Sequence, residues 1–467
     1  MWDLSKQKVL VIGGGLSGTA AARLLHTLGA KVTIVDAKSK LELKDSRLSL
    51  TKVPVKWIYG EDLPPSSKDF SLIVISPGVP RDHPLVKGAH LARVPVIGEL
   101  ELAYRFQNLK ILAVTGSNGK TTVAQLTYHI LKKLGIPAYL AGNIGEPFSD
   151  CVRELLSPQP PNYEVAVLEV SSFQLETIRE FHAKGAAFLN LSPDHLDRHK
   201  DMGSYLGVKN RVFLNQGPED FAIINIDDPL LAIKTHKAKI FGFSSKIRPE
   251  FGGYVDPNET SPVFRIVEGS EILATNPYLR YRLWGAHNQE NILAAVGLSL
   301  SVGADPQKAL EALEDFTPAS HRLELVGTFQ GVTYVDDSKG TNVGAVLTAL
   351  SNFPQKSVIL IAGGRDKDMD FRPLKIPARE KVRHLILMGE ARHKLKNVLK
   401  GTASMTSVSS MFEAVKVAKN LAKPGETVLL SPGCASYDMF KSYKERGEIF
   451  QNEVRLQNTS PQPKEVH

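Results

Sequence analysis

The chain has 467 residues, a length that predicts about three domains. Hydrophobic residues make up 42% and charged residues 23%, as is typical of a soluble globular protein, and no apolar run approaches the ~18 residues that a membrane helix requires. The net charge is +8, but Lys and Arg are spread along the chain. We therefore expect neither nucleic acid nor a membrane as a partner, because small polyanions such as nucleotides account for the positive charge.

Two features predict a cytoplasmic protein. The first residues, MWDLSKQKVLVIGGG, lack the pattern of a signal peptide, because their apolar stretch ends at glycines after a few residues. The two cysteines, Cys151 and Cys434, are too few for a disulfide scaffold and fit a reducing compartment. We interpret both as small buried hydrophobic residues.

Short β-branched runs alternate with amphipathic or turn-rich stretches along the chain. Each run ends in polar residues or glycine, a pattern typical of parallel sheets that helices cover on both faces. In chain order, the predicted strands lie in residues 8–14, 31–36, 70–78, 110–117, 165–172, 186–194, 221–228, 332–340, 357–364, 384–390 and 427–433. The predicted fold class is α/β, and function is expected at the carboxyl ends of the strands.

Changes in this pattern suggest where the domains meet. Residues 93–106 are expected to link a first sheet to a second, and residues 315–326, which hold a proline, to open a third domain. Residues 244–264 are polar and rich in turn formers, so a hairpin or excursion is expected there rather than a helix.

The segment after the first predicted strand, VLVIGGGLSGTAAARLL, fits a nucleotide loop. Gly13, Gly15 and Gly18 form the G-x-G-x-x-G pattern before a predicted helix, and Asp36 ends the next strand. In a dinucleotide fold such glycines admit a pyrophosphate to the helix N-terminus, and the acidic residue binds ribose hydroxyls. The segment predicts a diphosphate nucleotide without specifying a nicotinamide. A tight turn that binds no ligand is the alternative.

A second segment, AVTGSNGKTT at residues 113–122, has the character of a shortened phosphate loop. Only two residues separate Gly116 from Gly119, whereas the usual Walker A pattern has four there. Strand, glycine turn and amphipathic helix follow one another as a phosphate loop requires, so an accidental match is the weaker interpretation. Backbone N–H groups would hold the phosphates, Lys120 would reach the outer ones, and Thr121 would bind Mg²⁺.

TGSNGKTT resembles the ATP loop of the Mur ligases, the enzymes that build the peptide of peptidoglycan. Further stretches match this family in order along nearly the whole chain: LEVSSFQLE, LSPDHLDRH, GAHNQENILAA, SHRLE, VDDSKGTNVGA, IAGGRDKDMDF and LLSPGCASYDMF. One such match would be weak, but eight in register are strong. The combination of GGGLSG, DDSKGTN and SPGCAS is most similar to the members that add D-glutamate.

The resemblance implies three domains and an ATP-dependent amide ligation. A Rossmann-like domain for the UDP substrate would span residues 1–98, a central phosphate-loop ATPase domain with a mostly parallel sheet 99–318, and a second Rossmann-like domain for the amino acid 319–467. ATP would phosphorylate the carboxylate of UDP-N-acetylmuramoyl-L-alanine, and the amine of D-glutamate would displace the phosphate. The enzyme would act as a cytoplasmic monomer in peptidoglycan precursor synthesis, with ATP and two Mg²⁺ ions.

The resemblance also assigns residues to ATP. Arg322 would meet phosphate oxygens when the third domain closes, and Asp337 would reach a ribose hydroxyl. The full set of matching positions is Gly116, Ser117, Asn118, Gly119, Lys120, Thr121, Thr122, Asn288, Asn291, Arg322 and Asp337.

Two metal sites follow from the resemblance. Thr121 and Glu169 would hold one Mg²⁺, and His195 would lie near the second. Lys209 would be carbamylated, because a carbamate attracts Mg²⁺ whereas an ammonium repels it. Without the resemblance, Glu169 could be a plain surface carboxylate, DHLDRH a metal site or the solvated face of a helix, and Lys209 an ordinary surface lysine.

The remaining positions concern the two other substrates. The residues matched to the UDP substrate are Leu16, Ser17, Asp36, Gly78 and Asn143. Those matched to D-glutamate are His195, Thr341, Lys367, Ser436 and Tyr443. Lys367 would pair with a carboxylate of the amino acid. Two departures stand out, since family members often carry Thr-Arg where this chain has Ala37-Lys38, and phenylalanine where it has Tyr443.

Three other functions compete with this hypothesis. A sister ligase could add another amino acid, although the chain lacks the DNPR-like motif of the diaminopimelate and lysine members. An NAD-dependent oxidoreductase would explain GGGLSG and Asp36, yet it has no use for Lys120. A non-enzymatic nucleotide-binding scaffold would leave three motifs without a purpose: HN in GAHNQENILAA, HR in SHRLE, and DDSKGTN.

Overall fold

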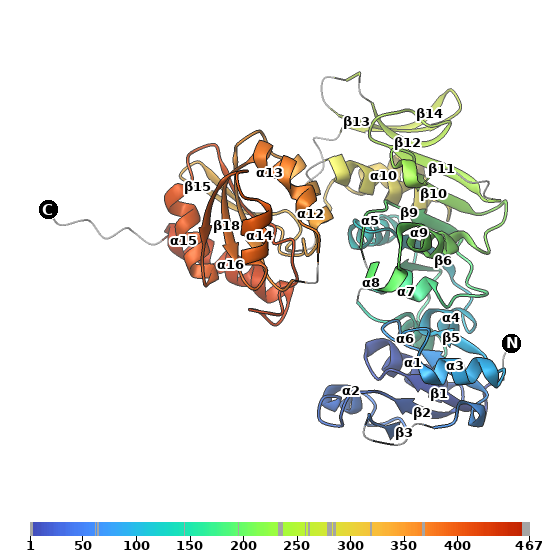
Figure 1. Ribbon diagram of the computed structural model, residues 1–467. Helices are drawn as coiled ribbons and strands as arrows, with labels where there is room; N and C mark the ends of the chain where they lie inside the picture. Colours follow the sequence, from blue (N-terminus) through green and yellow to red (C-terminus); the bar gives the residue numbers. More distant parts are fainter. Residues whose placement is uncertain are drawn as a thin grey trace. The chain divides into compact units, whose positions relative to one another are not determined.

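The computed structural model describes residues 3–459 except 61, 63–64, 144, 195, 232–236, 257, 260–261, 278–282, 284–285, 318–319 and 367–368. The chain forms two compact units, whose elements are labelled in Figure 1. The first unit comprises residues 1–191, 195–280 and 290–316, and the second comprises 192–194, 281–289 and 317–467. In the described part of the chain, no helix combines the length and hydrophobicity that crossing a bilayer requires.

The first unit begins with a five-stranded parallel sheet in the order β3-β2-β1-β4-β5. Its strands are β1 (Lys8–Ile12), β2 (Lys31–Val35), β3 (Val55–Ile58), β4 (Leu72–Ile75) and β5 (Val96–Gly98). The connections contain α1 (Leu16–Thr27), α2 (Lys44–Leu48), η1 (Ser67–Asp69) and α3 (Pro84–Leu91). Because the strand order reverses between β1 and β4, the loops after these strands meet at a topological switch point, where such sheets bind ligands. The Rossmann-like expectation is confirmed.

The same unit contains a nine-stranded sheet in the order β14-β13-β12-β11-β10-β9-β6-β8-β7. Its strands are β6 (Lys110–Thr115), β7 (Ala138–Gly142), β8 (Val165–Glu169), β9 (Gly185–Phe188), β10 (Phe221–Asn225), β11 (Lys239–Ser244), β12 (Phe251–Asp256), β13 (Val263–Glu268) and β14 (Glu271–Pro277). The strands from β7 to β12 pair in parallel, and β13 and β14 are antiparallel additions. The mostly parallel sheet and the hairpin expected within residues 244–264 are both confirmed.

Helices cover the nine-stranded sheet and connect its strands. They are α4 (Glu99–Tyr104), α5 (Lys120–Lys133), α6 (Phe148–Leu155), α7 (Ser172–Leu175), α8 (Leu196–His199), α9 (Met202–Asn210), η2 (Arg211–Phe213), η3 (Pro229–Leu231), α10 (Ala286–Leu300) and α11 (Pro306–Glu311). Residues 93–106 are only partly the expected link. Their first half forms β5, the edge of the five-stranded sheet, and the connection to β6 starts with α4.

Polar contacts join the two sheets of the first unit. Arg23 of α1 forms an ion pair with Asp150 of α6 at 2.6 Å. Glu101 of α4 is fully buried and accepts hydrogen bonds from the backbone N–H groups of residues 179–181, which follow α7. A continuous apolar core also extends from the helices of the first sheet to those of the second.

The second unit is built on a six-stranded sheet in the order β15-β16-β20-β17-β18-β19. Its strands are β15 (Glu324–Phe329), β16 (Val332–Asp336), β17 (Val358–Gly363), β18 (Val382–Met388), β19 (Ser404–Ser407) and β20 (Thr427–Leu430). The remaining elements are α12 (Val343–Ser351), η5 (Arg372–Leu374), α13 (Lys375–Lys381), α14 (Arg392–Val398), α15 (Met411–Leu421) and α16 (Tyr443–Thr459). All pairs except β15–β16 are parallel, and alternate residues of β17 pack into separate cores on the two faces.

Candidate active site

The loop between β6 and α5 has the geometry of a phosphate-binding turn. Gly116 has a φ of +149° and Gly119 a φ of +84°, values that favour glycine. A Cβ at Gly119 would lie 2.5 Å from Oδ1 of Asn291, and a Cβ at Gly116 would lie 3.1 Å from Cβ of Leu189. The loop leads into the first turn of α5, where backbone N–H groups favour anions. Thr122 in this turn is buried.

Asn190, which the sequence analysis did not single out, shapes this loop. Its side-chain oxygen accepts a hydrogen bond from the Asn118 N–H at 2.9 Å, and its side-chain nitrogen donates to the Asn118 carbonyl at 3.1 Å. Its backbone carbonyl accepts from the Ser117 N–H at 3.0 Å. An asparagine closely following β9, at the same carboxyl edge as the loop, was the signal that could have identified it.

Two lysine ammonium groups converge on the same loop. Nζ of Lys120 donates to the carbonyls of Gly116 and Ser117, each at 2.8 Å. Nζ of Lys209, from α9, donates to the Gly116 carbonyl at 2.8 Å and lies 4.8 Å from the ring centroid of Tyr205. Only 1% of Lys209 is exposed, so its interpretation as an ordinary surface lysine is wrong.

Thr121 and Glu169 meet beside the phosphate loop. The Thr121 hydroxyl donates to Oε2 of Glu169 at 2.6 Å, and the Asn143 side chain donates to Oε1 of the same carboxylate at 2.8 Å. Glu169 ends β8 and is 3% exposed, so the interpretation as a plain surface carboxylate is wrong. Asn143, which the resemblance matched to the UDP substrate, therefore orients this carboxylate in the structure.

The oxygen donors at this position fit a magnesium ion. Mg²⁺ prefers carboxylate and hydroxyl oxygens and is usually held by one or two protein ligands together with substrate phosphates. Thr121 and Glu169 supply such oxygens next to the anion-binding end of α5. His195, expected near a second ion, lies outside the described residues.

The DHLDRH segment is not a solvated helix face throughout. His199 is buried, its Nε2 lies 2.9 Å from the Ser172 hydroxyl, and its ring packs between Phe173 and Tyr205. Arg198 pairs with Glu176 at 2.8 Å. These contacts fix α8 against α7 and α9.

The first glycine loop is constrained by its own backbone. Gly13 has a φ of +94°, and a Cβ at Gly18 would lie 1.8 Å from the Gly13 carbonyl oxygen. The Asp36 carboxylate accepts hydrogen bonds from the N–H groups of Gly14 at 2.6 Å and Lys38 at 2.9 Å. The geometry is that of a tight nucleotide-type turn.

Three of the other residues expected at the UDP substrate lie close to this turn in the fold, whereas Asn143 lies beside Glu169 of the nine-stranded sheet. Leu16 and Ser17 open α1, with Leu16 largely exposed, and Gly78 lies in the loop after β4, across the switch point. No side chain caps the N-terminus of α1. This geometry is common to nucleotide-binding turns and to turns without a ligand.

In the second unit, Arg322 and Asp337 come together. Asp337 follows β16, is buried, and accepts a hydrogen bond from the Ser431 hydroxyl at 2.7 Å. Burial raises the pKa of Asp337 to about 7, while the positive charge of Arg322 opposes that shift.

Asn288 and Asn291 are both buried on α10, where their spacing of three residues places them on one helix face.

The loops expected to bind the amino acid follow neighbouring strands of the third sheet. Thr341 follows β16, and Ser436, which is buried, follows β20. Tyr443 begins α16, its carbonyl accepts a hydrogen bond from the Ser338 hydroxyl at 2.8 Å, and Nζ of Lys339 lies 3.9 Å from its ring centroid. Lys367 lies outside the described residues.

Family models match the chain in three consecutive segments. Residues 7–98 match the N-terminal domain of MurD-like Mur ligases, residues 114–299 match the Mur ligase middle domain, and residues 321–434 match the glutamate ligase domain of Mur ligases.

Curated relatives match nearly the full length. A UDP-N-acetylmuramoylalanine–D-glutamate ligase from Geotalea daltonii is 41% identical over 457 residues, covering 97% of this chain and 98% of the relative. The enzyme of the same name from Pelotomaculum thermopropionicum is 40% identical over 457 residues, with the same coverage of both chains.

Solved structures of more distant relatives share the fold. The UDP-N-acetylmuramate–alanine ligase MurC of Thermotoga maritima has a TM-score of 0.60 at 19% identity and covers 97% of this chain and 100% of its own. MurF of Acinetobacter baumannii has a TM-score of 0.62 at 17% identity and covers 96% of this chain and 93% of its own. MurF of Thermotoga maritima, in complex with ADP, has a TM-score of 0.60 at 16% identity and covers 91% of this chain and 96% of its own.

Proposed function

The chain belongs to the Mur ligase family, and on this basis we propose that it is an ATP-dependent ligase that joins D-glutamate to UDP-N-acetylmuramoyl-L-alanine. The observation that carries the proposal is the near-full-length identity of 41% to a ligase with that name. The buried Glu169 and Lys209, with Lys120, around a glycine-dependent phosphate loop support it. The match of residues 7–98 to a MurD-like domain favours a UDP substrate over NAD at the first glycine loop.

The reaction requires activation of a carboxylate. Its oxygen attacks the γ-phosphorus of ATP, the bond to the β-phosphate oxygen breaks, and ADP leaves. The product is an acyl phosphate. The amine of D-glutamate, after its ammonium form has given a proton to water, attacks the acyl carbon; the carbon–oxygen bond to phosphate breaks, inorganic phosphate leaves, and the nitrogen loses its second proton to water. Because the first step brings an anion against a polyanion, catalysis depends on cations and positioning more than on acid or base groups.

The phosphate-loop residues supply these cations and this positioning. Residues 116–122 bind the phosphates through backbone N–H groups, and the Lys120 ammonium neutralises charge on the outer phosphates. Asn288 and Asn291 contribute amide groups to the nucleotide, Arg322 binds phosphate oxygens, and Asp337 binds a ribose hydroxyl.

Metal ligands complete the proposed nucleotide site. Thr121 and Glu169 would hold one Mg²⁺, which would neutralise phosphate charge. Lys209 would be carbamylated and, with His195, would serve a second ion. The burial of Lys209 beside the phosphate loop, where its Nζ donates to the Gly116 carbonyl, supports a role for this residue at the nucleotide site.

The other substrates use the loops at the two Rossmann-like sheets. Leu16, Ser17, Asp36, Gly78 and Asn143 bind UDP-N-acetylmuramoyl-L-alanine. His195, Thr341, Lys367, Ser436 and Tyr443 bind D-glutamate. We further propose that the enzyme is a cytoplasmic monomer that binds neither nucleic acid nor membrane.

An amino-acid panel tests the proposal. Purified full-length protein with ATP, Mg²⁺ and UDP-N-acetylmuramoyl-L-alanine is expected to release phosphate only when D-glutamate is added. Equal turnover with L-lysine or diaminopimelate would instead indicate a sister ligase. No phosphate release with any amino acid would reject a ligase function on this muramoyl substrate.

A further inference from the structure

Arg322 stands between two residues with left-handed backbone conformations. His321 has a φ of +69° and Leu323 a φ of +48°, values that are uncommon for residues other than glycine and rarer for leucine than for histidine. Such strain persists only where surrounding contacts hold it in place. The contacts that hold this turn therefore determine where the Arg322 side chain begins.

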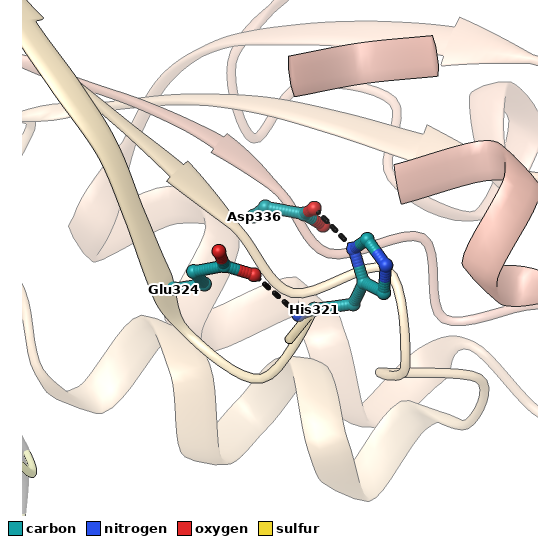
Figure 2. Close-up of side chains that lie close together, drawn as sticks. All are labelled: His321, Glu324 and Asp336. Atoms are coloured by element: carbon teal, nitrogen blue, oxygen red, sulfur yellow. Dashed lines mark hydrogen bonds and ion pairs between the residues drawn. The ribbon is translucent and has the colours of Figure 1, made fainter. Parts of the chain in front are cut away.

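Hydrogen bonds lock the turn onto the segment after β16. Nδ1 of His321 lies 2.7 Å from Oδ2 of Asp336, and the His321 N–H donates to Oε2 of Glu324 at 2.7 Å (Figure 2). The His321 carbonyl accepts from the Lys339 N–H at 3.0 Å. The backbone N–H of Leu323 faces the carboxylate of Asp337 and helps to lower the pKa of that group. The His321 side of Arg322 is thus tied by hydrogen bonds to the segment that carries Asp337.

Helix α16 closes this network from the other side. Nε2 of Gln451 donates to Asp336 at 2.9 Å and to Glu324 at 3.0 Å. A Cβ at Gly447 would lie 2.1 Å from Nδ1 of His321, so the helix backbone packs directly against the imidazole.

The same cluster has the composition of a metal site. One ligand atom from each of His321, Glu324 and Asp336 lies within 4.8 Å of the others. The Gln451 amide already donates to both carboxylates, and Asp336 is fully buried. Protein hydrogen bonds therefore satisfy the cluster, which favours a positioning role over metal binding.

We propose that His321 is a positioning residue for the nucleotide. Its bond to Asp336 holds the strained turn, and the turn presents Arg322 and the Leu323 N–H to the region of Asp337. The inference rests on the proposed function, because that function gives Arg322 and Asp337 their roles toward ATP.

Two substitutions separate the side-chain bond from the backbone conformation. His321→Asn keeps an N–H donor at the position of Nδ1 and tolerates a left-handed backbone, whereas His321→Ala loses both properties. Binding of the β,γ-imido analogue of ATP with Mg²⁺ is measured by calorimetry on the full-length variants. We expect His321→Ala to weaken binding about tenfold and His321→Asn to stay within about threefold of wild type.

A matched control removes another hydrogen-bonded histidine of the second unit. His384 on β18 lies 2.9 Å from the Thr406 hydroxyl, and His384→Ala is expected to leave nucleotide affinity unchanged. If His321→Ala does not fold, as judged by circular dichroism, His321→Gln replaces it, because its amide lies one methylene too far out. Equal affinity of His321→Asn and the variant that lacks the bond would overturn the proposal.

A double substitution tests whether His321 acts through its neighbour. When Arg322 is already replaced by alanine, His321→Ala is expected to weaken nucleotide binding by less than about a further twofold, because His321 acts on the nucleotide through Arg322. If the effects of the two substitutions on affinity were fully additive, His321 would not act through Arg322. The analogue is not turned over, so wild type that binds it but releases no phosphate with D-glutamate would refute the proposed function while leaving this test intact. If the enzyme is active, the His321→Ala variant should have a higher KM for ATP than wild type and an unchanged KM for D-glutamate.

Discussion

Two ammonium groups point at a single carbonyl oxygen in the phosphate loop. Lys120 and Lys209 both donate to the Gly116 carbonyl, and Lys209 is buried beside Tyr205. Like charges repel, and a bound phosphate or a carbamate on Lys209 would each reduce that repulsion. The two lysines that the proposed function assigns to phosphate and to metal binding therefore both contact the Gly116 carbonyl oxygen.

Replacing Lys209 tests the carbamate. Lys209→Ala is expected to reduce phosphate release by roughly 100-fold or more, because a group bearing charge at the reacting centre is lost. Short carboxylates or bicarbonate should partly restore activity by occupying the vacated space. Lys132→Ala, at an exposed position near the end of α5, serves as the control and should be active. Wild-type turnover of Lys209→Ala would show that no carbamate is needed.

The titration of His321 provides a second test at this scale. Its hydrogen bond to Asp336 raises the pKa of the imidazole above the ordinary value, despite burial. A raised folded-state pKa stabilises the fold below the unfolded-state pKa, and this contribution is lost as pH rises through the folded-state pKa. NMR titration should therefore give a pKa above the usual ~6.5, and Asp336→Asn should lower it. A pKa at or below that value in wild type would contradict the ion pair.

At the scale of the elements, α16 forms hydrogen bonds to two loops that the proposed function assigns to different substrates. Arg446 on this helix is 1% exposed. Its guanidinium donates to the Ser338 hydroxyl at 3.0 Å, the Ser338 carbonyl at 2.8 Å and the Cys434 carbonyl at 3.1 Å. Ser338 adjoins Asp337, and Cys434 lies two residues before Ser436. One side chain thus braces the nucleotide-side loop against the amino-acid-side loop.

The three hydrogen bonds of the planar Arg446 guanidinium group lead to a prediction about stability. Arg446→Lys is expected to lower the free energy of unfolding of the second unit by roughly 2 kcal/mol, because a lysine cannot reach all three acceptors and leaves buried ones unpaired. Urea unfolding followed by circular dichroism measures this change. Arg455→Lys, exposed on the same helix, should change stability by less than about 0.5 kcal/mol. Equal effects of the two substitutions would show that the buried fork adds nothing.

The sequence pattern predicts some strands of this protein and misses others. Each predicted strand segment overlaps a strand, because buried parallel strands are short apolar runs that end in polar or glycine residues. Other strands escape this pattern for different reasons. β19, with the residues SMTS, is partly exposed, and β5 has only three residues and lies within the segment predicted as a link. These strands are defined by pairing with neighbours, which no local pattern reveals.

At the scale of the whole molecule, the chain divides into two compact units with separate cores. The first unit contains two sheets that share one apolar core, whereas the third sheet has cores on its own two faces. The predicted boundaries at residues 98 and 318 remain predictions, although the sheets change between β5 and β6 and between β14 and β15. A shared core suggests that the first two sheets unfold together.

Unfolding should therefore occur in two cooperative steps. Leu112→Ala removes core volume in the first unit and Leu360→Ala in the second, each costing about 2–5 kcal/mol. Each substitution is expected to shift only one transition in urea, followed by circular dichroism and by hydrogen exchange of each unit. A single transition that both substitutions shift equally would show that the units unfold as one.

The sequence by itself determined the α/β class, the positions of most strands along the chain, the two glycine loops and the family. These properties depend on local periodicity, on backbone conformations that only glycine allows, and on residues that are contiguous in the chain. The tertiary structure decided that Lys209 and Glu169 are buried, that Asn190 shapes the phosphate loop, and that His321 and Arg446 brace the third sheet. Those contacts join residues far apart in sequence, and strand register and helix packing, rather than local pattern, bring them together.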